Sequence, residues 1–532
     1  MAISLLFLLV PFYDYTNNFH NKFFPSFLVK ENFKLEKKAL IYNNIYSKNE
    51  WVVQFNVAQY SSILVEQVDG SVDIEALIFH DNTTKSKHIR NNTKCLILEP
   101  DEKMLEFEPF EILTIDAEAS IWLIKCKINN RKILNNSNST VAIIDKNDFE
   151  NSQNRFEHLI VKSQKPSIFK RSVPKKKQIS HCVHLIYNLD ETRLQNLIEW
   201  ISIQRQLNIA KIRLYFHKVS DPIYAIRKIR EANNDEKFVE VIYYKNELKD
   251  FCQIKTNFRN SNQFSSDNCD KSFKIHFSKS TQKHEKINTN DCYLNYKYEY
   301  EYVSNYDFDE FIFPRSYHKI DQIQLLDLFS HSQQKNNNCL SVNYSMPYYD
   351  LYNYTRYLQD MLGGSSVAYL QFDNTFMLLK YRNILDKILK YTSGYLFEYH
   401  KDNRSIKFTV SESDKELVRN FQNVIPIIDC LNETNRIKMK SDFYKSKWNN
   451  AYSLRTIFRL GKSIFVTDNT LTVNVHGADN VLPGTKYKTV PLDYGFVSHF
   501  RNDFDLDSES KTHVFSLLKF DLEYYLFFSK SF

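Results

Sequence analysis

Three carboxylates stand within four residues near the middle of the chain, in the segment Asp307-Phe308-Asp309-Glu310. Such a cluster is costly unless a cation or a hydrogen-bond network compensates it, because adjacent anionic groups repel one another and apolar neighbours withhold solvent. On an extended segment, Asp307 and Asp309 point to the same side and could share one ion. Magnesium or manganese suits this pair, since hard cations take few protein oxygens and complete their shell with water and phosphate. The alternative is an acidic turn that ends a strand.

The composition limits what the chain can bind. With 532 residues and 43% hydrophobic content, the chain is large enough for two or three domains. It has only 8 glycines and no glycine-rich phosphate loop, so a bound nucleotide would be held by metal and side chains. The net charge of +7 is modest, and the densest basic run, 170–177, contains Pro174 and lies between two regions of regular structure. We therefore interpret this run as a solvated linker and expect no nucleic-acid partner.

The first half of the chain indicates a β-rich domain over 50–165. Antiparallel strands are predicted from short alternating or β-branched runs, at 51–57, 72–79, 94–98 and 121–126. Cys95 and Cys126 lie in two of these runs and could form a disulfide that pins the domain. The eight cysteines contain no C-x-x-C pair, which argues against zinc ribbons and thioredoxin-like chemistry. A basic linker over 166–178 is expected to follow.

Beyond this linker, strands alternate with helices. The strands are predicted at 181–187, 212–216 and 239–244, and the intervening helices begin at Asp190 and at Asp221-Pro222. This order predicts an α/β fold with a parallel, doubly wound sheet. A polar stretch over 253–288 is predicted to be an exposed loop, and a helix over 290–300 leads to the acidic cluster. Asp307 and Asp309 would then lie at the carboxyl edge of the sheet, where such folds bind ligands.

Several short motifs are familiar in type and order. The first group is His181-Cys182-Val183-His184 with the helical Glu199-Trp200-Ile201. The second group is Asn290-Asp291-Cys292-Tyr293 with Asp307-Phe308-Asp309-Glu310-Phe311-Ile312. The third group is C-terminal and consists of Lys462-Ser463-Ile464-Phe465-Val466, Val475-His476-Gly477 and His499-Phe500-Arg501. In these motifs the chain resembles glycosyltransferase family 92. The resemblance implies a catalytic domain of GT-A type over 179–505, a Rossmann-like mixed sheet flanked by helices, with a C-terminal tail over 506–532.

The resemblance also implies an activity and its cofactor. A metal-dependent, inverting glycosyltransferase would move a hexose, expected to be galactose, from a UDP-sugar donor to a glycan or glycoprotein acceptor. Asp309 would bind Mn²⁺ or Mg²⁺ directly, Asp307 would contact ribose or a metal-bound water, and His476 would complete the metal shell. Glu310 would orient that shell or cap a turn.

An inverting reaction calls for a carboxylate general base. Asp350 and Asp373 are the candidates, although the sequence favours a structural role for each, and Trp200 is expected in the core rather than beneath a sugar.

Some positions depart from the family pattern. Ser304 and Asn305 stand where the strand before the acidic cluster is usually more apolar, and Asn208 replaces a glycine after the first helix. These departures leave open a catalytically inactive relative that acts as a glycan-binding or scaffolding protein.

The N-terminal segment 1–49 begins with an apolar run that is too short to span a bilayer, which takes about 20 residues. We interpret it as a targeting segment or the remnant of an anchor. The expected location is therefore the Golgi or another secretory-pathway membrane, with membrane association through this segment.

Overall fold

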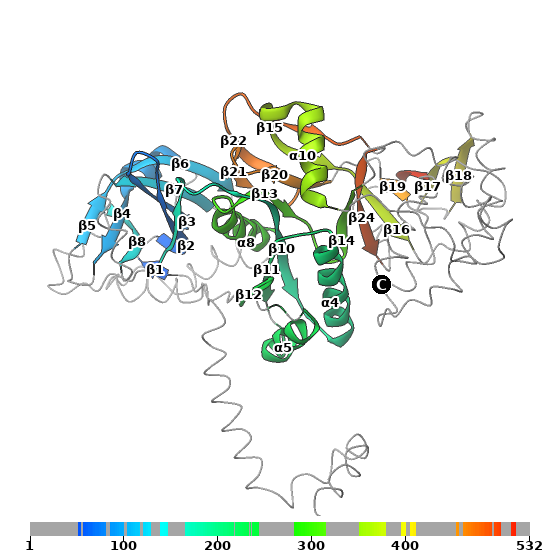
Figure 1. Ribbon diagram of the computed structural model, residues 1–532, viewed down its shortest axis with the longest axis horizontal. Coiled ribbons are helices and arrows are strands. Elements are labelled where there is room, and N and C mark those ends of the chain that lie inside the picture. Colours follow the sequence, from blue (N-terminus) through cyan, green and yellow to red (C-terminus); the bar gives the residue numbers. More distant parts are fainter. Residues whose placement is uncertain are drawn as a thin grey trace, which may run out of the picture. The chain divides into compact units, whose positions relative to one another are not determined.

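The computed structural model describes residues 52–146, 165–243, 281–314, 350–378 and 461–501, with short gaps in the first, second and last ranges, together with residue 150 and four isolated strands (Figure 1). These strands are β17 (Tyr395–His400), β18 (Ser405–Val410), β19 (Leu454–Thr456) and β25 (Thr512–Leu517). The expected targeting segment 1–49 and, apart from β25, the predicted tail 506–532 lie outside these residues. Within the described ranges, no helix is long and apolar enough to cross a membrane.

The strands from β1 to β8 form the β-rich region that the sequence predicts. Its larger sheet has the order β1 (Val52–Gln54), β2 (Val57–Glu66), β3 (Val72–His80), β7 (Ile121–Ile128), β6 (Pro109–Asp116). A smaller sheet has the order β5 (Met104–Phe107), β4 (Thr93–Leu98), β8 (Thr140–Asp145), and α2 (Ser86–Asn92) precedes β4. A disulfide between Cys95 of β4 and Cys126 of β7 joins the two sheets, as the sequence suggested.

The predicted basic linker is not a free connection. Residues Ser167–Lys170 form β9, which pairs in parallel with β2. The chain then leads directly into β10 (Lys176–Tyr187). Strand β2 offers an open edge to the incoming chain there, and the side chains of Lys170 and Lys176 stay exposed while the backbone pairs.

The central sheet has seven strands, in the order β12 (Val239–Tyr243), β11 (Lys211–His217), β10, β13 (Tyr300–Asn305), β20 (Lys462–Val466), β15 (Val367–Phe372), β23 (Lys486–Thr489). The first four are parallel, and β20 runs antiparallel to both β13 and β15. The sheet is therefore mixed rather than wholly parallel. This α/β architecture is compatible with a GT-A type fold, although few helices flank the sheet.

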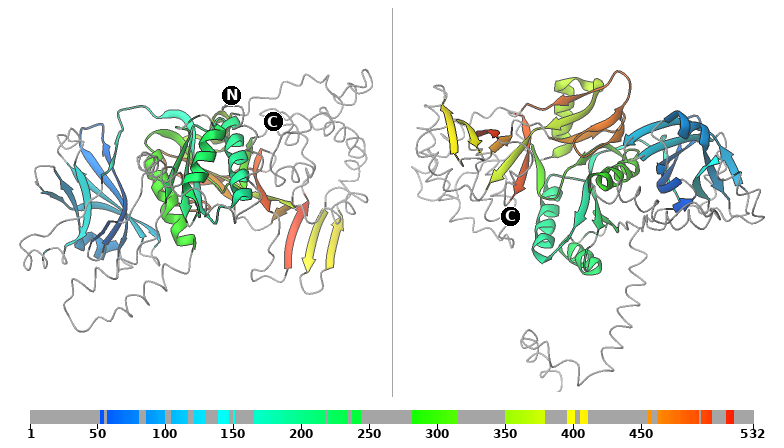
Figure 2. Two further views of the ribbon diagram at one scale, coloured as in Figure 1. Left: turned by 90° about the horizontal axis from the view of Figure 1, so that it is seen from below. Right: turned by 180° about the vertical axis from the view of Figure 1, so that it is seen from behind.

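Helices begin where the sequence predicts them. The Asp190 side chain accepts from the Arg193 backbone N–H at 2.8 Å and caps α4 (Glu191–Gln206). Pro222 opens α5 (Pro222–Asn233), which packs against α4 (Figure 2). After α4, Asn208 takes the glycine position with φ 60, in the left-handed region that asparagine tolerates.

One helix differs from its prediction. Helix α8 (Thr281–Tyr296) includes residues 281–288, which were expected in a loop, and it ends before 300, while residues 251–280 lie outside the described part. Half of its buried residues are polar, and among them Asn288, Asn290 and Asp291 are each at most 1% exposed. Tyr60 Oη donates to Asn288 Oδ1 at 2.8 Å. Hydrophobic periodicity therefore could not reveal the first half of the helix, because hydrogen bonds satisfy its buried polar side chains.

The β-rich region and the central sheet share one hydrophobic core. A single cluster of buried side chains includes Tyr60 and Leu77 from the first, Leu185 and Tyr215 from the second, and Ile287 of α8. Helix α8 contacts β10 and also β2 and β3 (Figure 1).

A second disulfide fastens α8 to the central sheet. It joins Cys182 of β10 to Cys292 of α8, and both residues are at most 1% exposed. Helix α8 is therefore the element that couples the two regions.

The remaining elements border the central sheet. A third sheet has the order β14 (Glu310–Pro314), β24 (Gly495–Arg501), β16 (Asn374–Leu378), β19, β25, β17, β18. A two-stranded ribbon consists of β21 (Thr470–Val473) and β22 (Ala478–Val481). Helix α10 (Leu351–Leu362) and the short 3₁₀ helix η3 (Gly364–Ser366) precede β15.

Candidate active site

The acidic cluster lies at the carboxyl end of β13, where the sequence predicts it. Strand β13 ends at Asn305, and Glu310 begins β14, so the cluster forms the turn between two sheets. The Glu310 backbone N–H donates to the Asp307 carbonyl at 3.0 Å, and the Asp307 N–H donates to Glu310 Oε2 at 3.0 Å. These two bonds fix the turn. The position matches the ligand-binding edge of open α/β sheets.

A buried lysine supplies positive charge to this cluster. Lys462, the first residue of β20, is 2% exposed, and its Nζ lies 3.1 Å from Asp307 Oδ2 and 3.2 Å from Glu310 Oε2. Burial disfavours the ammonium, but the charges of Asp307 and Glu310 outweigh burial and raise the pKa of Lys462. The compensating cation that the sequence requires therefore includes this lysine. A lysine at the start of a mostly apolar strand could have indicated this ion pair in the sequence, because lysine is almost never buried unless it is paired.

His476 is held near the cluster by a short turn. Asn474 Oδ1 accepts from the backbone N–H of His476 at 2.9 Å and of Gly477 at 2.7 Å. Asn305 Nδ2 donates to the Asn474 carbonyl at 2.6 Å, so the turn is attached to the last residue of β13. The sequence motif containing His476 and the acidic cluster, far apart along the chain, thus share one anchor.

The protonation of His476 follows from its contacts. Its Nδ1 lies 3.1 Å from the Gly461 carbonyl, which can only accept, so Nδ1 carries the hydrogen and Nε2 keeps its lone pair. Burial and the charge of Lys462 lower the pKa of His476, and the charge of Asp307 acts in the opposite direction. The imidazole is therefore neutral at physiological pH, in the form that ligates metals.

A second histidine, which sequence reasoning did not select, faces the same site. His184 of β10 is 3% exposed, and its Nδ1 lies 2.9 Å from Thr289 Oγ1. The Thr289 hydroxyl also lies 2.7 Å from the Glu285 carbonyl and can donate either to that carbonyl or to His184 Nδ1, so both tautomers of His184 are compatible with these contacts. Burial lowers the pKa of His184 to about 3, and the charges of Asp307, Lys462 and His476 also act on it.

Two buried side chains beside the turn have few hydrogen-bond partners. His184 Nε2 and Asn305 Oδ1 are buried and make no well-formed hydrogen bond among the described residues. The two side chains interact with each other, and this interaction raises the pKa of His184 against the larger effect of burial. Unpaired buried polar atoms are rare in proteins, so a bound group or water at this position would complete their hydrogen bonding.

The charges agree with a divalent ion. Three carboxylates, Asp307, Asp309 and Glu310, and one ammonium, Lys462, leave two formal negative charges, and the neutral His476 adds none. Within the described ranges, however, no three side chains of His, Cys, Asp or Glu are arranged to hold a metal ion by themselves. The donor set fits Mg²⁺ or Mn²⁺ only in the mode where few protein oxygens bind and substrate phosphates complete the shell.

The two carboxylates considered as general base lie in different settings. Asp350 caps α10, accepting from the N–H groups of Tyr352 and Asn353, and also accepts from Asn208 Nδ2 at 3.0 Å. These bonds account for Asp350 without a catalytic role. Asp373, 5% exposed, directly follows Phe372, the register partner of Lys462, so the topology brings it to the site.

Other predicted residues are placed as follows. Trp200 is fully buried, and its Nε1 donates to the Glu310 carbonyl at 2.6 Å, which confirms it as a core residue that supports the acidic turn. The backbone of His499 pairs with Glu310, while its side chain lies outside the described part. Glu285 was not predicted: burial and then the charge of Asp307 raise the pKa of its carboxyl, which places a fourth acidic group near the cluster.

A comparison of the sequence with protein-family models supports the resemblance that the motifs indicate. The family model of glycosyltransferase family 92 matches residues 177–375, a range that contains β10, α4, α8, β13 and the acidic cluster but not Lys462 or His476. No curated protein matches the chain. Residues 177–375 therefore match glycosyltransferase family 92, and a match to this family indicates a glycosyltransferase.

Proposed function

We propose that the chain transfers a hexose from a UDP-sugar to a hydroxyl of a glycan or glycoprotein, with Mn²⁺ or Mg²⁺ as cofactor and with galactose as the first sugar to test. One observation carries this proposal: at the carboxyl edge of β13, the buried ammonium of Lys462 lies 3.1 Å from Asp307 Oδ2 and 3.2 Å from Glu310 Oε2, in the turn that also contains Asp309. A turn with more carboxylates than ammonium groups suits a divalent ion and the diphosphate that the ion would neutralise.

In this proposal each side chain has a distinct task. Asp309 and Asp307, with His476 Nε2, would hold the metal, which when bound offsets the charge that develops on the departing UDP. Lys462 positions Asp307 and Glu310 by its two ion pairs and thereby fixes the turn. The Gly461 carbonyl keeps His476 in the tautomer that presents Nε2.

The acceptor hydroxyl must lose a proton to a carboxylate if the reaction inverts the sugar. Asp373 is the better of the two predicted candidates, because Asp350 already caps α10. Glu285 is a further candidate, since a carboxyl with a raised pKa holds a proton closer to neutral pH. Either residue would act beside the acidic turn.

A location in the Golgi or elsewhere in the secretory pathway belongs to the same proposal. Two disulfides, Cys95–Cys126 and Cys182–Cys292, lie in the core, and structural disulfides are typical of oxidising compartments. The N-terminal segment would provide targeting and membrane association.

The test is a UDP-release assay on the full chain with a panel of UDP-hexoses, with Mn²⁺, with Mg²⁺ and with a chelator. We expect release to need the metal and Asp309→Asn to abolish it, because the variant loses a ligand charge. Asp360→Asn, the same change at an exposed position of α10, is the matched control and should keep full activity. Retained turnover in Asp309→Asn, or equal turnover with chelator, would refute the metal-dependent mechanism.

The alternative is an inactive relative that binds glycans or serves as a scaffold. Calorimetry with UDP and Mn²⁺ separates the two possibilities, since a decayed donor site would bind no nucleotide in a metal-dependent manner. Metal-dependent UDP binding that disappears in Asp309→Asn would favour the enzyme.

A further inference from the structure

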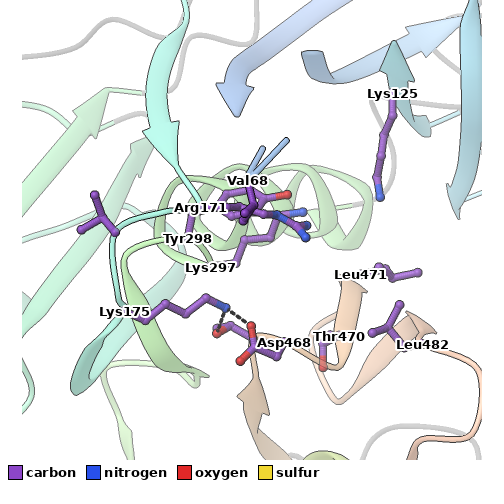
Figure 3. A pocket seen from close by; sticks show the side chains of 12 residues that line it. Val68, Lys125, Arg171, Lys175, Lys297, Tyr298, Asp468, Thr470, Leu471 and Leu482 are labelled. Atoms are coloured by element: carbon purple, nitrogen blue, oxygen red, sulfur yellow. Dashed lines mark hydrogen bonds and ion pairs between the residues drawn. The ribbon is translucent and has the colours of Figure 1, made fainter. Parts of the chain in front are cut away.

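A pocket of about 270 Å³ lies where the β-rich region meets the central sheet (Figure 3). The turn after β2, the segment before β10, the end of α8, and the turns next to β20 and β22 all contribute to it. The lining residues are Val68, Lys125, Arg171, Val173, Lys175, Lys297, Tyr298, Thr467, Asp468, Thr470, Leu471 and Leu482. None of them was selected from the sequence as a site residue.

The lining is strongly cationic. Four lining side chains are basic and only Asp468 is acidic. Lys297 Nζ lies 2.6 Å from Glu75 Oε2, and Lys125 Nζ lies 2.6 Å from Glu111 Oε2, but neither of these glutamates lines the pocket. A ligand in the pocket would therefore face positive charge whose partners lie behind the wall.

Two of the cations can accept a new partner at little cost. Lys175 Nζ contacts Asp468 Oδ1 at 2.5 Å, but the Asp468 side chain is 77% exposed, and such surface pairs contribute at most about 1 kcal/mol. The Arg171 guanidinium lies 5.4 Å from the centre of the Tyr298 ring and bonds to the Tyr298 side chain, and the charges of Glu75 and Asp73 also attract it. Figure 3 shows Lys175 and Asp468 meeting at the edge of the pocket.

Burial of two of these lysines also favours the binding of an anion. Burial lowers the pKa of Lys175, and burial lowers the pKa of Lys297 to about 8. Ammonium groups in this condition gain more from an anionic partner than fully hydrated ones do.

The mouth of the pocket is apolar. Val68, Val173 and Leu482 are 82%, 59% and 37% exposed, and they are among the few large apolar side chains exposed within the described ranges. Exposed apolar groups around a polar cavity are characteristic of ligand sites. The combination favours a ligand with an anionic group and an apolar face, and the volume suits a body of about one sugar ring.

This pocket is separate from the acidic turn. Strand β20 begins at Lys462, which contacts the acidic turn, and Thr467 and Asp468 follow its end. At about 3.3 Å per residue, the two sites lie roughly 20 Å apart along the strand. The pocket therefore lies at the opposite edge of the sheet from the proposed donor site.

We propose that this pocket is an accessory site that binds an acidic sugar unit, whose sulfate, phosphate or carboxylate contacts Arg171 and Lys175 while its ring packs on Val68 and Leu482. The inference does not depend on the donor site.

The first test uses position 68, which is so exposed that substitution should not disturb folding. Val68→Asp places a carboxylate at the mouth, and Val68→Asn is its neutral isostere. Ligand-observed NMR titrations of the full chain would use glucose 6-sulfate, glucuronate, inorganic sulfate and glucose. We expect both acidic sugars to bind more tightly than sulfate or glucose, and Val68→Asp to weaken them about fivefold relative to Val68→Asn, as a like charge about 4 Å away in water does.

The second test removes the cations. The double variant Arg171→Gln/Lys175→Gln should weaken the acidic sugars at least about tenfold, since each charge-assisted contact is strong. Lys177→Gln, an exposed lysine two residues from Lys175 that does not line the pocket, should bind as the parent does.

Equal affinity in Val68→Asp and Val68→Asn, or glucose binding as tightly as the acidic sugars, would overturn the proposal. Inorganic sulfate binding as tightly as the acidic sugars would overturn the assignment of a sugar ligand. Metal-dependent UDP binding, measured on the same variants, should not change, which separates this proposal from the function of the donor site.

Discussion

Replacing Lys462 by methionine tests whether an internal ion pair organises the acidic turn. Methionine keeps the length and apolar stem of lysine but removes the ammonium. Asp307 and Glu310 would then lose the cation that lies 3.1 and 3.2 Å away. Glu310, 1% exposed, would be left as a buried carboxylate without this partner. We expect a large loss of stability from this single change.

The magnitude follows from the geometry. At an effective dielectric constant of 20, each pair attracts by roughly 5 kcal/mol before desolvation is counted. Burial of the ammonium offsets much of this, and the Asp307 side chain is 39% exposed, so water screens its share. Removing one partner of a buried pair costs about 3 to 5 kcal/mol, because the other charge remains buried. We expect about 3 kcal/mol for Lys462→Met at neutral pH.

The pH dependence has a definite sign. Without Lys462 the folded-state pKa of Glu310 rises above its unfolded value, so the folded protein binds a proton that relieves the buried charge. The destabilisation is therefore fully present at neutral pH and shrinks as the pH falls through the raised pKa. A loss caused only by altered packing would not depend on pH in this way.

Urea unfolding, followed by far-UV circular dichroism and tryptophan fluorescence, measures the effect; Trp200, which bonds to Glu310, reports on the turn. Lys177→Met is the matched surface control and should change stability by less than about 0.5 kcal/mol. Lys462→Met/Glu310→Gln should recover at least about 1 kcal/mol relative to the sum of the single variants. A loss below about 1 kcal/mol for Lys462→Met, with additive single variants, would refute the reasoning.

Three further predictions concern acid stability, the second disulfide and the general base. Burial lowers the pKa of His181 and of His184 to about 3, so the unfolded chain binds protons below pH 6.5 that the folded chain does not. Each histidine therefore contributes stability above pH 6.5 that is lost as the pH falls, about 2 kcal/mol at pH 5; equal urea midpoints at pH 7.5 and 5 would contradict this. Cys182→Ala/Cys292→Ala should lower the free energy of unfolding by about 2 to 5 kcal/mol, and a loss under about 1 kcal/mol would show that the disulfide is not structural. Asp350→Ala should cost about 1 kcal/mol of stability through its lost cap and keep UDP release, whereas Asp373→Asn should abolish release; the reverse pattern would make Asp350 the base.

Much of the central sheet could be predicted because its signals are local. Apolar runs and capping residues mark β10, α4, β11, α5 and β12, and each forms where periodicity places it. The acidic turn could be located for the same reason, since it follows directly on a strand. The antiparallel β20 could not be placed in the sheet, because its partners β13 and β15 are distant in sequence.

The elements that were predicted incompletely or not at all bury polar groups. Helix α8 has little hydrophobic periodicity, because Asn288 and Asp291 face the core and bond to Tyr60 and Tyr215. Lys462 is similar: its burial depends on two carboxylates more than 150 residues away in sequence. Local patterns cannot signal a buried charge whose partner comes from another part of the chain.

The polar residues before the acidic turn have a structural purpose. Ser304 Oγ lies 2.7 Å from His181 Nδ1, and Asn305 Nδ2 holds the turn that positions His476. An apolar residue at 305 would release that turn and with it the position of His476. An apolar residue at 304 would leave the buried His181 Nδ1 without this partner. The departure from the family pattern at Ser304 and Asn305 therefore has a structural reason, because both side chains attach neighbouring segments to the end of β13.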